Sequence, residues 1–373
     1  MRAMRIIQVV NVRFFNATAW YGMTLAELLR AKGHEVLVLG LEGTESWEVG
    51  ASRGLPMLGM NLNTTNPLSL AAMYRGMRAL VRDFRPDVIN CHRGESFVLW
   101  GLLKAQTRGF KLVRTRGDQR PPKNNLPNRL LHHRLADAVV ATNSRMARHF
   151  VKEMGLPGDH VWTILGGVDK SLFRPDPEAR ARVRAEFGYG ENDFVVGMVG
   201  RFDGVKGQPE MIEALARAYH GGRTNLRLLL IGFDTTISSE EVGQWCHEAG
   251  VDHLVRITGP RGDVPDCINA LDLGVTASRF SETIARAPME IMACGVPLLA
   301  TDVGVLPDLV PPEGLLPSED PHALARLLDK AASDPGYLES VRRGEQATMR
   351  QCGLDDFATQ TLALYKGLAE ESA

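Results

Sequence analysis

Two glutamates eight residues apart, Glu282 and Glu290, mark the part of this sequence whose residue types could do chemistry. An apolar run at residues 271–277 precedes them and another at residues 296–300 follows, which predicts a strand, a loop, a helix and a strand of a parallel sheet. Ligands of such sheets bind at the carboxyl ends of the strands. Because ionised carboxylates only accept hydrogen bonds, the pair suits a hydroxyl-rich ligand such as a sugar or a ribose.

The start of the predicted helix offers a site for an anion. Ile284, Ala285 and Arg286 place backbone N–H groups at the helix N-terminus, where unpaired amides and the helix dipole favour a phosphate. We therefore expect an extended ligand with a phosphate between the two carboxylates. Two glutamates at this spacing are common on solvated helices, so the interpretation depends on the rest of the chain.

Two cations follow a predicted buried strand earlier in the second half. The strand covers Phe194–Val199, and the pairs Gly200-Arg201 and Lys206-Gly207 come after it. Solvated surface charges are the usual interpretation of such a pair. Their place beside a glycine-bearing turn after a buried strand instead favours contact with an anionic ligand.

Composition limits the class of protein. A chain of 373 residues predicts two domains, and 44% hydrophobic with 23% charged residues is typical of a globular protein. The net charge of −1 argues against a nucleic-acid partner. Five scattered cysteines without a C-x-x-C pair indicate a reducing compartment and no zinc site. No apolar run approaches a membrane span of about 20 residues, and the run at residues 6–10 is too short for a signal peptide, so we expect a cytoplasmic protein.

Strands and helices alternate along the whole chain, which predicts parallel, doubly wound sheets. We expect an α/β protein with two Rossmann-like domains that face a central cleft. The first covers residues 1–170 and is joined by a C-terminal helix at residues 354–373, and the second covers residues 171–353. The predicted strands lie at residues 6–10, 34–39, 87–91, 111–115, 138–142, 161–165, 194–199, 226–231, 255–257, 271–277 and 296–300.

Taken together, these features resemble the retaining GT-B glycosyltransferases of the large group 1 family, which is marked by an E-x7-E motif. The resemblance extends over nearly the whole chain and is stronger in the second half. The matching residues are Glu282 and Glu290, the pairs Gly200-Arg201 and Lys206-Gly207, Gly167-Val168-Asp169 with Phe173 and Pro175, the segment from Leu25 to Val36, and the segment from Ala293 to Gly304.

The resemblance implies a role for each residue of the second half. Glu290 binds the ribose of a nucleotide sugar, and Glu282 binds hydroxyls of the sugar that is transferred. Arg201 and Lys206 hold the diphosphate, with the N–H groups of residues 284–286. These groups stabilise the negative charge that develops on the leaving diphosphate. No D-x-D motif is present, so we expect no metal and no cofactor besides the donor substrate.

The first half departs from the family pattern, and we assign three of its residues to the acceptor side. Asn16 lies in a first loop that lacks the usual glycine pair. Arg116 stands where many members have a histidine, and because arginine cannot act as a base we expect it to contact a phosphate or an anionic acceptor. His92 ends another strand, where a satisfied structural histidine is an equal alternative. Thr283 replaces a glycine that usually follows the first glutamate.

A basic stretch runs from Lys104 to Lys152, with twelve lysines and arginines against two aspartates and no glutamate. A solvated face is one interpretation. The other is attraction to anionic lipid headgroups or to a phosphorylated acceptor. Because Leu126, Leu130 and Leu131 lie among the cations, as in an interfacial helix, we expect a peripheral enzyme on the inner face of the membrane that builds lipopolysaccharide or another envelope glycan.

The sequence thus predicts a retaining, metal-independent glycosyltransferase with a glycan or glycolipid acceptor. One alternative is a GT-B sugar-nucleotide epimerase, which would release nucleotide without an acceptor. Another is a non-catalytic protein that binds sugar nucleotides or glycans. Binding alone does not require cations at the leaving group, so Arg201 and Lys206 favour the transferase.

Overall fold

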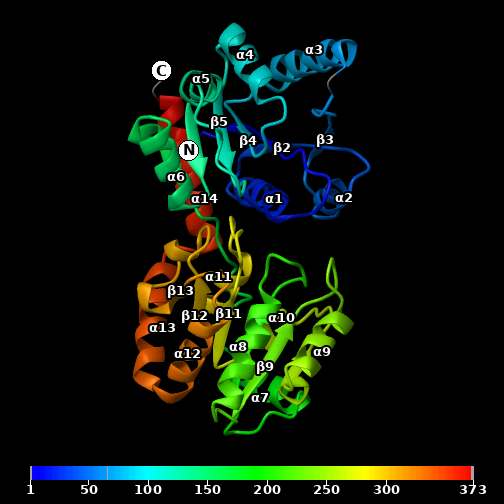
Figure 1. Ribbon diagram of the computed structural model, residues 1–373. Helices are drawn as coiled ribbons and strands as arrows, with labels where there is room; N and C mark the ends of the chain where they lie inside the picture. The colour runs from blue at the N-terminus through cyan, green and yellow to red at the C-terminus, as the bar shows by residue number, and fades with distance from the viewer. Residues whose placement is uncertain (1, 65, 371–373) are drawn as a thin grey trace. The chain divides into compact units, whose positions relative to one another are not determined.

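The computed structural model describes residues 2–64 and 66–370, which form two compact units (Figure 1). Unit 1 extends to Gly166 and includes the chain from Leu354 onward, and unit 2 is Gly167–Gly353. The expected boundaries were residues 170/171 and 353/354. Residues 371–373 of the expected C-terminal helix lie outside the described residues.

Within the described part of unit 1, seven parallel strands form one sheet in the order β3-β2-β1-β4-β5-β6-β7. Every strand pair in it is parallel, which requires a crossover between neighbours. The strands are β1 (Arg5–Val9), β2 (Glu35–Gly40), β3 (Met57–Gly59), β4 (Val88–Cys91), β5 (Lys111–Arg116), β6 (Ala138–Ala141) and β7 (Val161–Thr163).

Helices of unit 1 supply these crossovers. The helices of this unit are α1 (Ala17–Ala31), α2 (Glu45–Ser52), α3 (Pro67–Phe84), α4 (Phe97–Thr107), α5 (Leu126–Leu130), η1 (Leu131–Leu135), α6 (Ser144–Arg148), η2 (His149–Glu153), η3 (Gly158–His160) and α14 (Leu354–Glu370). The last helix of the chain, α14, also belongs to unit 1 although unit 2 precedes it in the sequence.

Unit 2 has a six-stranded parallel sheet among its described residues, in the order β10-β9-β8-β11-β12-β13. Its strands are β8 (Phe194–Val199), β9 (Leu226–Ile231), β10 (Val255–Ile257), β11 (Leu273–Thr276), β12 (Leu298–Thr301) and β13 (Leu315–Leu316). Its helices are α7 (Pro177–Glu186), α8 (Gln208–His220), α9 (Ser239–Glu248), η4 (Asp252–Leu254), α10 (Val264–Asn269), α11 (Arg286–Ala293), η5 (Leu306–Asp308), η6 (Pro312–Gly314), α12 (Pro321–Ser333) and α13 (Pro335–Met349).

Both sheets reverse their strand order at one point, beside their first strand. In unit 1 the first strand, β1, lies between β2 and β4, and in unit 2 the first strand, β8, lies between β9 and β11. The crossovers on the two sides of such a strand leave in opposite directions, so the loops at its carboxyl end open a crevice where ligands of this fold class bind. The candidate residues lie at or after the carboxyl ends of β1, β4, β5, β8 and β11.

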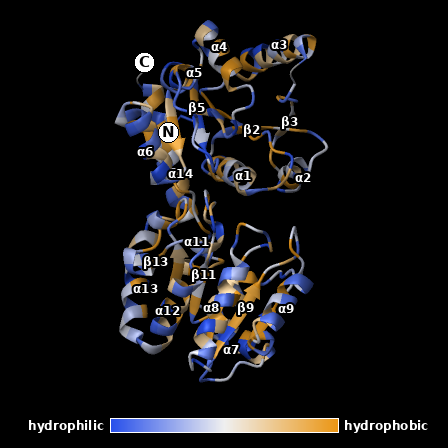
Figure 2. Ribbon diagram, viewed as in Figure 1, coloured by the Kyte–Doolittle hydropathy of each residue, from blue (hydrophilic) through white to orange (hydrophobic). Residues whose placement is uncertain are grey.

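Each sheet is held by apolar strands that are covered by helices. In β9 the sequence Leu-Arg-Leu-Leu-Leu-Ile is almost entirely buried, as expected for a parallel strand covered on both faces. Figure 2 shows this strand as strongly hydrophobic, and the helices of unit 2 as mixed. The core of unit 2 joins the strands to α8 and α12, and a separate core in unit 1 joins the strands to α3 and α4.

Helix α14 is fixed to unit 1 by buried polar and aromatic contacts. The hydroxyl oxygen of Tyr365 accepts hydrogen bonds from Gln8 Nε2 at 3.3 Å and from Asn90 Nδ2 at 2.9 Å. The ring of Phe357 packs against that of Tyr21, with centroids 4.5 Å apart. The carboxyl-terminal helix therefore stabilises β1 and β4, the two strands at the switch point of unit 1.

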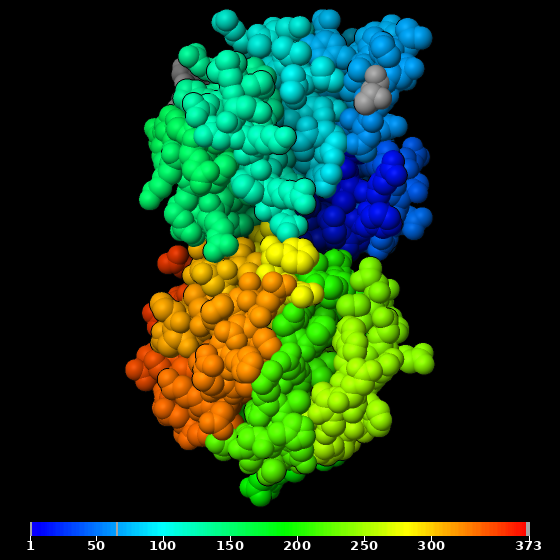
Figure 3. Space-filling view, viewed as in Figure 1, coloured from blue at the N-terminus to red at the C-terminus, as the bar shows by residue number. Residues whose placement is uncertain are grey.

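The predicted fold class is confirmed, since both units are Rossmann-like with parallel sheets. Each predicted strand has a counterpart in the structure, and its first and last residues differ from the predicted ones by at most two positions. The prediction missed β3 and β13, which are edge strands of three and two residues and lack a buried apolar run. In Figure 3 the teal and green part of unit 1 shows that the basic stretch, residues 104–152, covers much of the visible face of that unit.

Candidate functional site

The switch point of unit 2 brings together two loops that are far apart in the sequence. Strand β8 pairs with β11, and the loops after them carry Lys206 and Glu282. The backbone N–H of Arg279 donates to the carbonyl of Val205 at 2.8 Å, which ties one loop to the other. The expected cations and the first expected carboxylate therefore lie on one edge of one sheet.

Glu282 is the most constrained member of this group. Its side chain is 7% exposed, and its Oε2 accepts hydrogen bonds from Lys206 Nζ at 2.8 Å and from Ser278 Oγ at 2.7 Å. Two donors, one of them cationic, offset the cost of burying a carboxylate. Sequence analysis did not identify Ser278 as a site residue. Its place at the end of β11, four residues before the glutamate, was the available signal.

Two glycines allow the backbone to close around this pair. A Cβ on Gly207 would lie 2.0 Å from the carbonyl oxygen of Ala277, and a Cβ on Gly304 would lie 1.9 Å from that of Glu282. Both glycines also have positive φ, of 77° and 59°. Only glycine satisfies both conditions, so the two residues fix Lys206 and Glu282 through the packing of the main chain.

Arg201 is the most accessible cation of the group, with a side chain that is 54% exposed. Its Nε donates to Asp203 Oδ2 at 2.5 Å, and Asp203 Oδ1 accepts from the N–H of Val205 at 2.9 Å. The buried aspartate thus orients the guanidinium and shapes the loop, a role that sequence analysis missed. The preceding Gly200 has φ 146° and donates its N–H to Ile231 at 2.9 Å, so its contribution is the turn.

The amides expected to bind a phosphate divide into two kinds. Within the described residues, the N–H groups of Ile284 and Ala285 have no hydrogen-bond partner, and both side chains are buried. The N–H of Arg286, in contrast, donates to the carbonyl of Ile284 at 3.1 Å. The turn that starts α11 therefore already uses this third amide, and its contact with a phosphate remains a prediction.

Glu290 lies in the second turn of α11, and its side chain is mostly buried. Burial raises the pKa of its carboxyl group, and the guanidinium of Arg286, 3.4 Å away, partly opposes the shift. Burial deprives a carboxylate here of hydrogen bonds that it would have in water. Hydroxyl groups of a ligand would supply them, and the expected ribose contact remains a prediction.

In unit 1, His92 does not lie where an acceptor could touch it. Its side chain is 1% exposed and its Nε2–H donates to Gln8 Oε1 at 2.7 Å. The other end of Gln8 donates to Tyr365. Burial, and then the nearby Arg114, lower the pKa of His92 to about 3, so the imidazole is neutral. This corrects its assignment as an acceptor contact and favours the structural alternative.

Asn16 also has a structural partner, since it is the N-cap of α1. Its Oδ1 accepts from the N–H groups of Thr18 and Ala19 at 3.0 and 3.1 Å. This capping stabilises the start of the helix. Any contact of Asn16 with an acceptor would have to use its amide nitrogen, and it remains a prediction.

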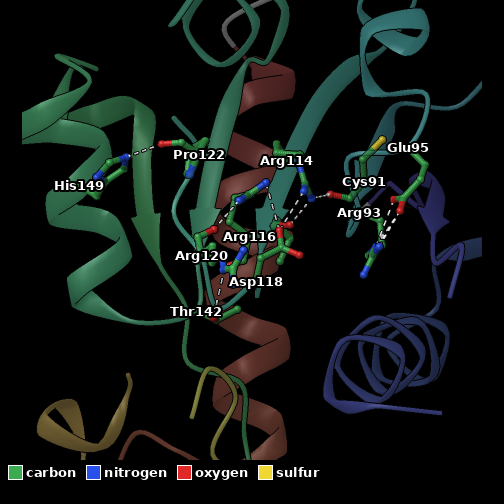
Figure 4. Close-up of polar contacts among 11 residues, drawn as sticks. Cys91, Arg93, Glu95, Arg114, Arg116, Asp118, Arg120, Pro122, Thr142 and His149 are labelled. Carbon is green, nitrogen blue, oxygen red and sulfur yellow. Dashed lines mark hydrogen bonds and ion pairs between the residues drawn. The ribbon is translucent and has the colours of Figure 1, made fainter. Parts of the chain in front are cut away.

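Arg116, the last residue of β5, belongs to a group of charged residues at the carboxyl edge of the sheet (Figure 4). Its NH1 lies 3.1 Å from Asp118 Oδ2, and its NH2 donates to the carbonyl of Arg120 at 3.0 Å. Arg114 and Arg93 lie in the same group. Sequence analysis assigned neither of them to a site, because Arg114 was only one cation of the basic stretch and Arg93 lies outside it. The strand pairing of β4 with β5 brings them together.

No metal site is evident in the described part of the chain, where no three or more His, Cys, Asp or Glu side chains are grouped to hold an ion. The expectation that the reaction needs no metal remains a prediction.

Comparison with known families identifies both units. Residues 179–349 match the family described as glycosyl transferases group 1, and residues 19–172 match glycosyltransferase family 4. Together these two matches account for most of the chain, one in each unit.

Relatives of known function are distant in sequence. The D-inositol 3-phosphate glycosyltransferase 1 of Catenulispora acidiphila is 26% identical over 328 residues, which cover 82% of this chain and 77% of the relative. The lipopolysaccharide core biosynthesis mannosyltransferase LpsB of Rhizobium meliloti is 28% identical over 246 residues, 63% of this chain and 67% of LpsB. Alignments with four other D-inositol 3-phosphate glycosyltransferases span only 52 to 59% of those proteins.

Among solved structures, Alr3699/HepE of Anabaena in complex with UDP has the same fold. It superimposes with a TM-score of 0.84 at 20% identity, over 98% of this chain and all of the other. At this identity the likeness concerns the fold alone.

The close approach at Gly304 generates a test. Gly304→Ala places a Cβ on the carbonyl of Glu282, whereas Gly259→Ala, at φ 68° with nothing within 4 Å, adds only backbone strain. We expect Gly259→Ala to lower the free energy of unfolding of unit 2 by about 1 kcal/mol. Gly304→Ala should lower it by at least about 2 kcal/mol more. Urea unfolding of the full chain measures both, and equal effects would contradict the packing described.

Proposed function

Because this chain belongs to the glycosyl transferases of group 1, we propose that it transfers a sugar from a nucleoside diphosphate sugar to an envelope glycan and retains the configuration at the anomeric carbon. One observation carries the proposal. The Lys206–Glu282 pair and the unpartnered amides of Ile284 and Ala285 lie at the carboxyl edge of the sheet in unit 2. This edge offers cations, N–H donors and a carboxylate to one ligand.

The cations and the amides suit the leaving group. When the bond between the anomeric carbon and the phosphate oxygen breaks, negative charge develops on the diphosphate. Lys206 and Arg201 can stabilise that charge without moving, since Glu282 and Asp203 already hold them in place, and the two amides are fixed in the main chain that leads into α11. We propose that these groups provide the charge stabilisation, and that no metal ion takes part.

The carboxylates suit the neutral parts of the donor. Glu282 Oε2 accepts from Lys206 and Ser278, whereas no donor among the described residues reaches Oε1, which could accept from a sugar hydroxyl. Glu290, two turns away, would accept from the ribose. We propose that the acceptor hydroxyl attacks on the face from which the diphosphate leaves, and that its proton passes to the departing phosphate oxygen. This step needs no protein base.

The proposed acceptor is a glycan of the cell envelope. The support is the resemblance to LpsB, whose name assigns it to lipopolysaccharide core biosynthesis, and the basic stretch of unit 1. The two aspartates of this stretch are already paired, Asp137 with Lys104 at 2.8 Å and Asp118 with Arg116. The exposed cations of this stretch are Arg108, Arg120, Lys123, Arg129, Arg134, Arg145, Arg148 and Lys152.

We also propose that the enzyme is cytoplasmic and attaches to an anionic membrane surface through α5. Leu126 and Leu130 of this helix are 68% and 49% exposed. Leu126 lies between Lys123 and Arg129 in the sequence, and Leu130 directly follows Arg129. Exposed leucines beside cations are typical of interfacial segments. Across the described residues, no helix is both long and apolar enough to cross a membrane.

Nucleotide binding is the first test. Thermal-shift assays with UDP, GDP, ADP and their sugar conjugates should identify one base that raises the melting midpoint of the wild type. Glu290→Ala should weaken binding of that nucleotide at least about tenfold, because the hydrogen bonds to the ribose are lost.

Lys206→Ala should reduce kcat for turnover of the donor by about 100- to 1000-fold, because the charge on the leaving diphosphate is less well stabilised.

The matched control is Glu248→Ala, which removes an exposed carboxylate from α9 of the same unit. It should leave nucleotide affinity unchanged. If no nucleotide stabilises the wild type, or if one binds but is never turned over with any glycan, the transferase proposal fails in favour of a binding protein. Release of nucleotide without an acceptor, together with epimerised sugar, would instead identify an epimerase.

The stereochemistry of the product tests the retaining mechanism. Proton NMR of the anomeric centre should show the same configuration in the product as in the donor sugar, because attack and departure occur on one face. An inverted product would contradict retention. A covalent sugar–enzyme adduct trapped with a slow donor would contradict the step without a protein nucleophile.

Membrane attachment can be tested by co-sedimentation with lipid vesicles. The full chain should bind vesicles of phosphatidylcholine with phosphatidylserine but not those of phosphatidylcholine alone, and should dissociate at about 1 M salt, where the Debye length is about 3 Å. Leu126→Glu should reduce binding, whereas Leu68→Glu, at an exposed position on α3 outside the basic stretch, should not. Equal loss in both variants would contradict a role for α5.

A further inference from the structure

Three arginines converge at the carboxyl edge of the sheet in unit 1, and we call Arg93, Arg114 and Arg116 the arginine cluster. Arg114 and Arg116 are in β5, and Arg93 follows the neighbouring strand β4. Figure 4 shows their side chains with Asp118 and Glu95 between and beside them. All three residues belong to unit 1, whereas the groups proposed to bind the diphosphate belong to unit 2.

Arg114 forms the buried base of the cluster, with a side chain that is 1% exposed. Its NH1 donates to the carbonyls of Cys91 at 2.8 Å and Thr115 at 2.5 Å, and its NH2 to Asp118 Oδ2 at 3.4 Å. Two of these three acceptors are neutral and the only carboxylate is at a long distance. The positive charge of Arg114 is therefore poorly compensated.

Arg116 shares the same carboxylate oxygen. Its NH1 lies 3.1 Å from Asp118 Oδ2, its NH2 donates to the carbonyl of Arg120, and its Nε is buried without a hydrogen-bond partner among the described residues. One aspartate thus serves two guanidinium groups. Arg93 adds a third, which forms its own ion pair with Glu95 at 2.6 Å.

The cluster consequently holds more positive than negative charge in a largely buried place. Burial and then the neighbouring Arg116 lower the pKa of Arg114 to about 10. Burial also lowers the pKa of Arg116, where Asp118 opposes the shift and Arg93 adds to it. Both shifts come first from the burial of the two guanidinium groups, which share the one carboxylate of Asp118. A ligand with negative charge would remove the imbalance and the unpaired N–H together.

We infer that the arginine cluster binds a phosphate group carried by the acceptor. The inference rests on the proposed function, since it names the chemistry of the acceptor of that reaction. Arg116 and Arg93 are the contacting residues, because their side chains are partly exposed. Arg114 and Asp118 are positioning residues that hold Arg116.

Phosphate fits this arrangement better than a carboxylate. A phosphate monoester presents three oxygens and up to two negative charges, whereas a carboxylate presents two oxygens and one charge and is matched by a single guanidinium. The guanidinium groups of Arg93 and Arg116 come from two neighbouring strands, so they would approach an anion from two directions. After Asp118 and Glu95 are counted, the cluster keeps an excess of positive charge, so an anion of either kind is favoured and the number of oxygens decides for phosphate.

Calorimetric titration of inorganic phosphate into the full chain tests the site. Lys206→Ala serves as the background, because it weakens phosphate binding at the proposed diphosphate site of unit 2. We expect phosphate to bind this variant, and to bind at least about tenfold more weakly after Arg116→Gln, because a charge-assisted hydrogen bond is lost. Asp118→Asn should tighten binding, since it frees two guanidinium groups. Simple misfolding would weaken binding in both variants.

Arg134→Gln is the matched control, because it removes an exposed arginine from the same basic stretch. It should leave phosphate affinity unchanged. Absence of phosphate binding to the Lys206→Ala chain, or equal weakening by Arg116→Gln and Arg134→Gln, would overturn the inference. Acetate that binds as tightly as phosphate would overturn the choice of ligand.

Two further titrations connect the site to the acceptor. Glucose 6-phosphate should bind with an affinity similar to that of inorganic phosphate, and glucose should bind at least about tenfold more weakly. If inorganic phosphate binds and glucose 6-phosphate does not, the cluster is a site for free phosphate. This result would overturn the assignment of the site to a phosphorylated acceptor. Nucleotide binding to the wild type is measured separately, so a failure of the proposed function is distinguishable from a failure of this inference.

Discussion

The carboxylate of Glu282 is the interaction on which the site in unit 2 depends. An ionised carboxylate at 7% exposure is unfavourable unless cationic and hydroxyl donors satisfy it, and Lys206 and Ser278 do so at 2.8 and 2.7 Å. This pairing joins the loop after β8 to the loop after β11. The close main-chain contacts at Gly207 and Gly304 hold both loops in the required position. The ammonium group is thus placed before any ligand arrives, which is what electrostatic stabilisation of a leaving group requires.

The two units use the same topology in different ways. At the switch point of unit 2, the first strand is followed by cations and a carboxylate. At that of unit 1, Gln8, His92 and Tyr365 form a buried network in which the imidazole is neutral. Charge in unit 1 is instead found one strand farther along, at the end of β5 where Arg116 lies. The shared fold therefore places cations at both edges, paired with the buried carboxylate of Glu282 in unit 2 and in excess over their carboxylates in unit 1.

Most of the fold could be predicted from the sequence, because a buried parallel strand is a continuous apolar run that needs no partner to be recognised. The strands at residues 194–199 and 226–231 are examples, and both have the predicted bounds. The prediction failed where burial is slight. Strand β3 has three residues at the edge of its sheet, two of them exposed, so it has no apolar pattern to detect.

The sequence by itself determined the two Rossmann-like units and which charged residues follow their strands, since these depend on local patterns. The tertiary structure decided which of those residues meet. Ser278 and Glu282 are close in sequence, but Lys206 reaches them from 76 residues away because β8 and β11 are neighbours. The burial of His92 was likewise invisible, since it arises where α1 packs over the strand end: a Cβ on Gly22 would lie 3.1 Å from the imidazole. The positions of charged residues and the spacing of apolar residues can be read along the chain, whereas ion pairs between distant residues and the burial of a side chain arise only when distant segments pack together.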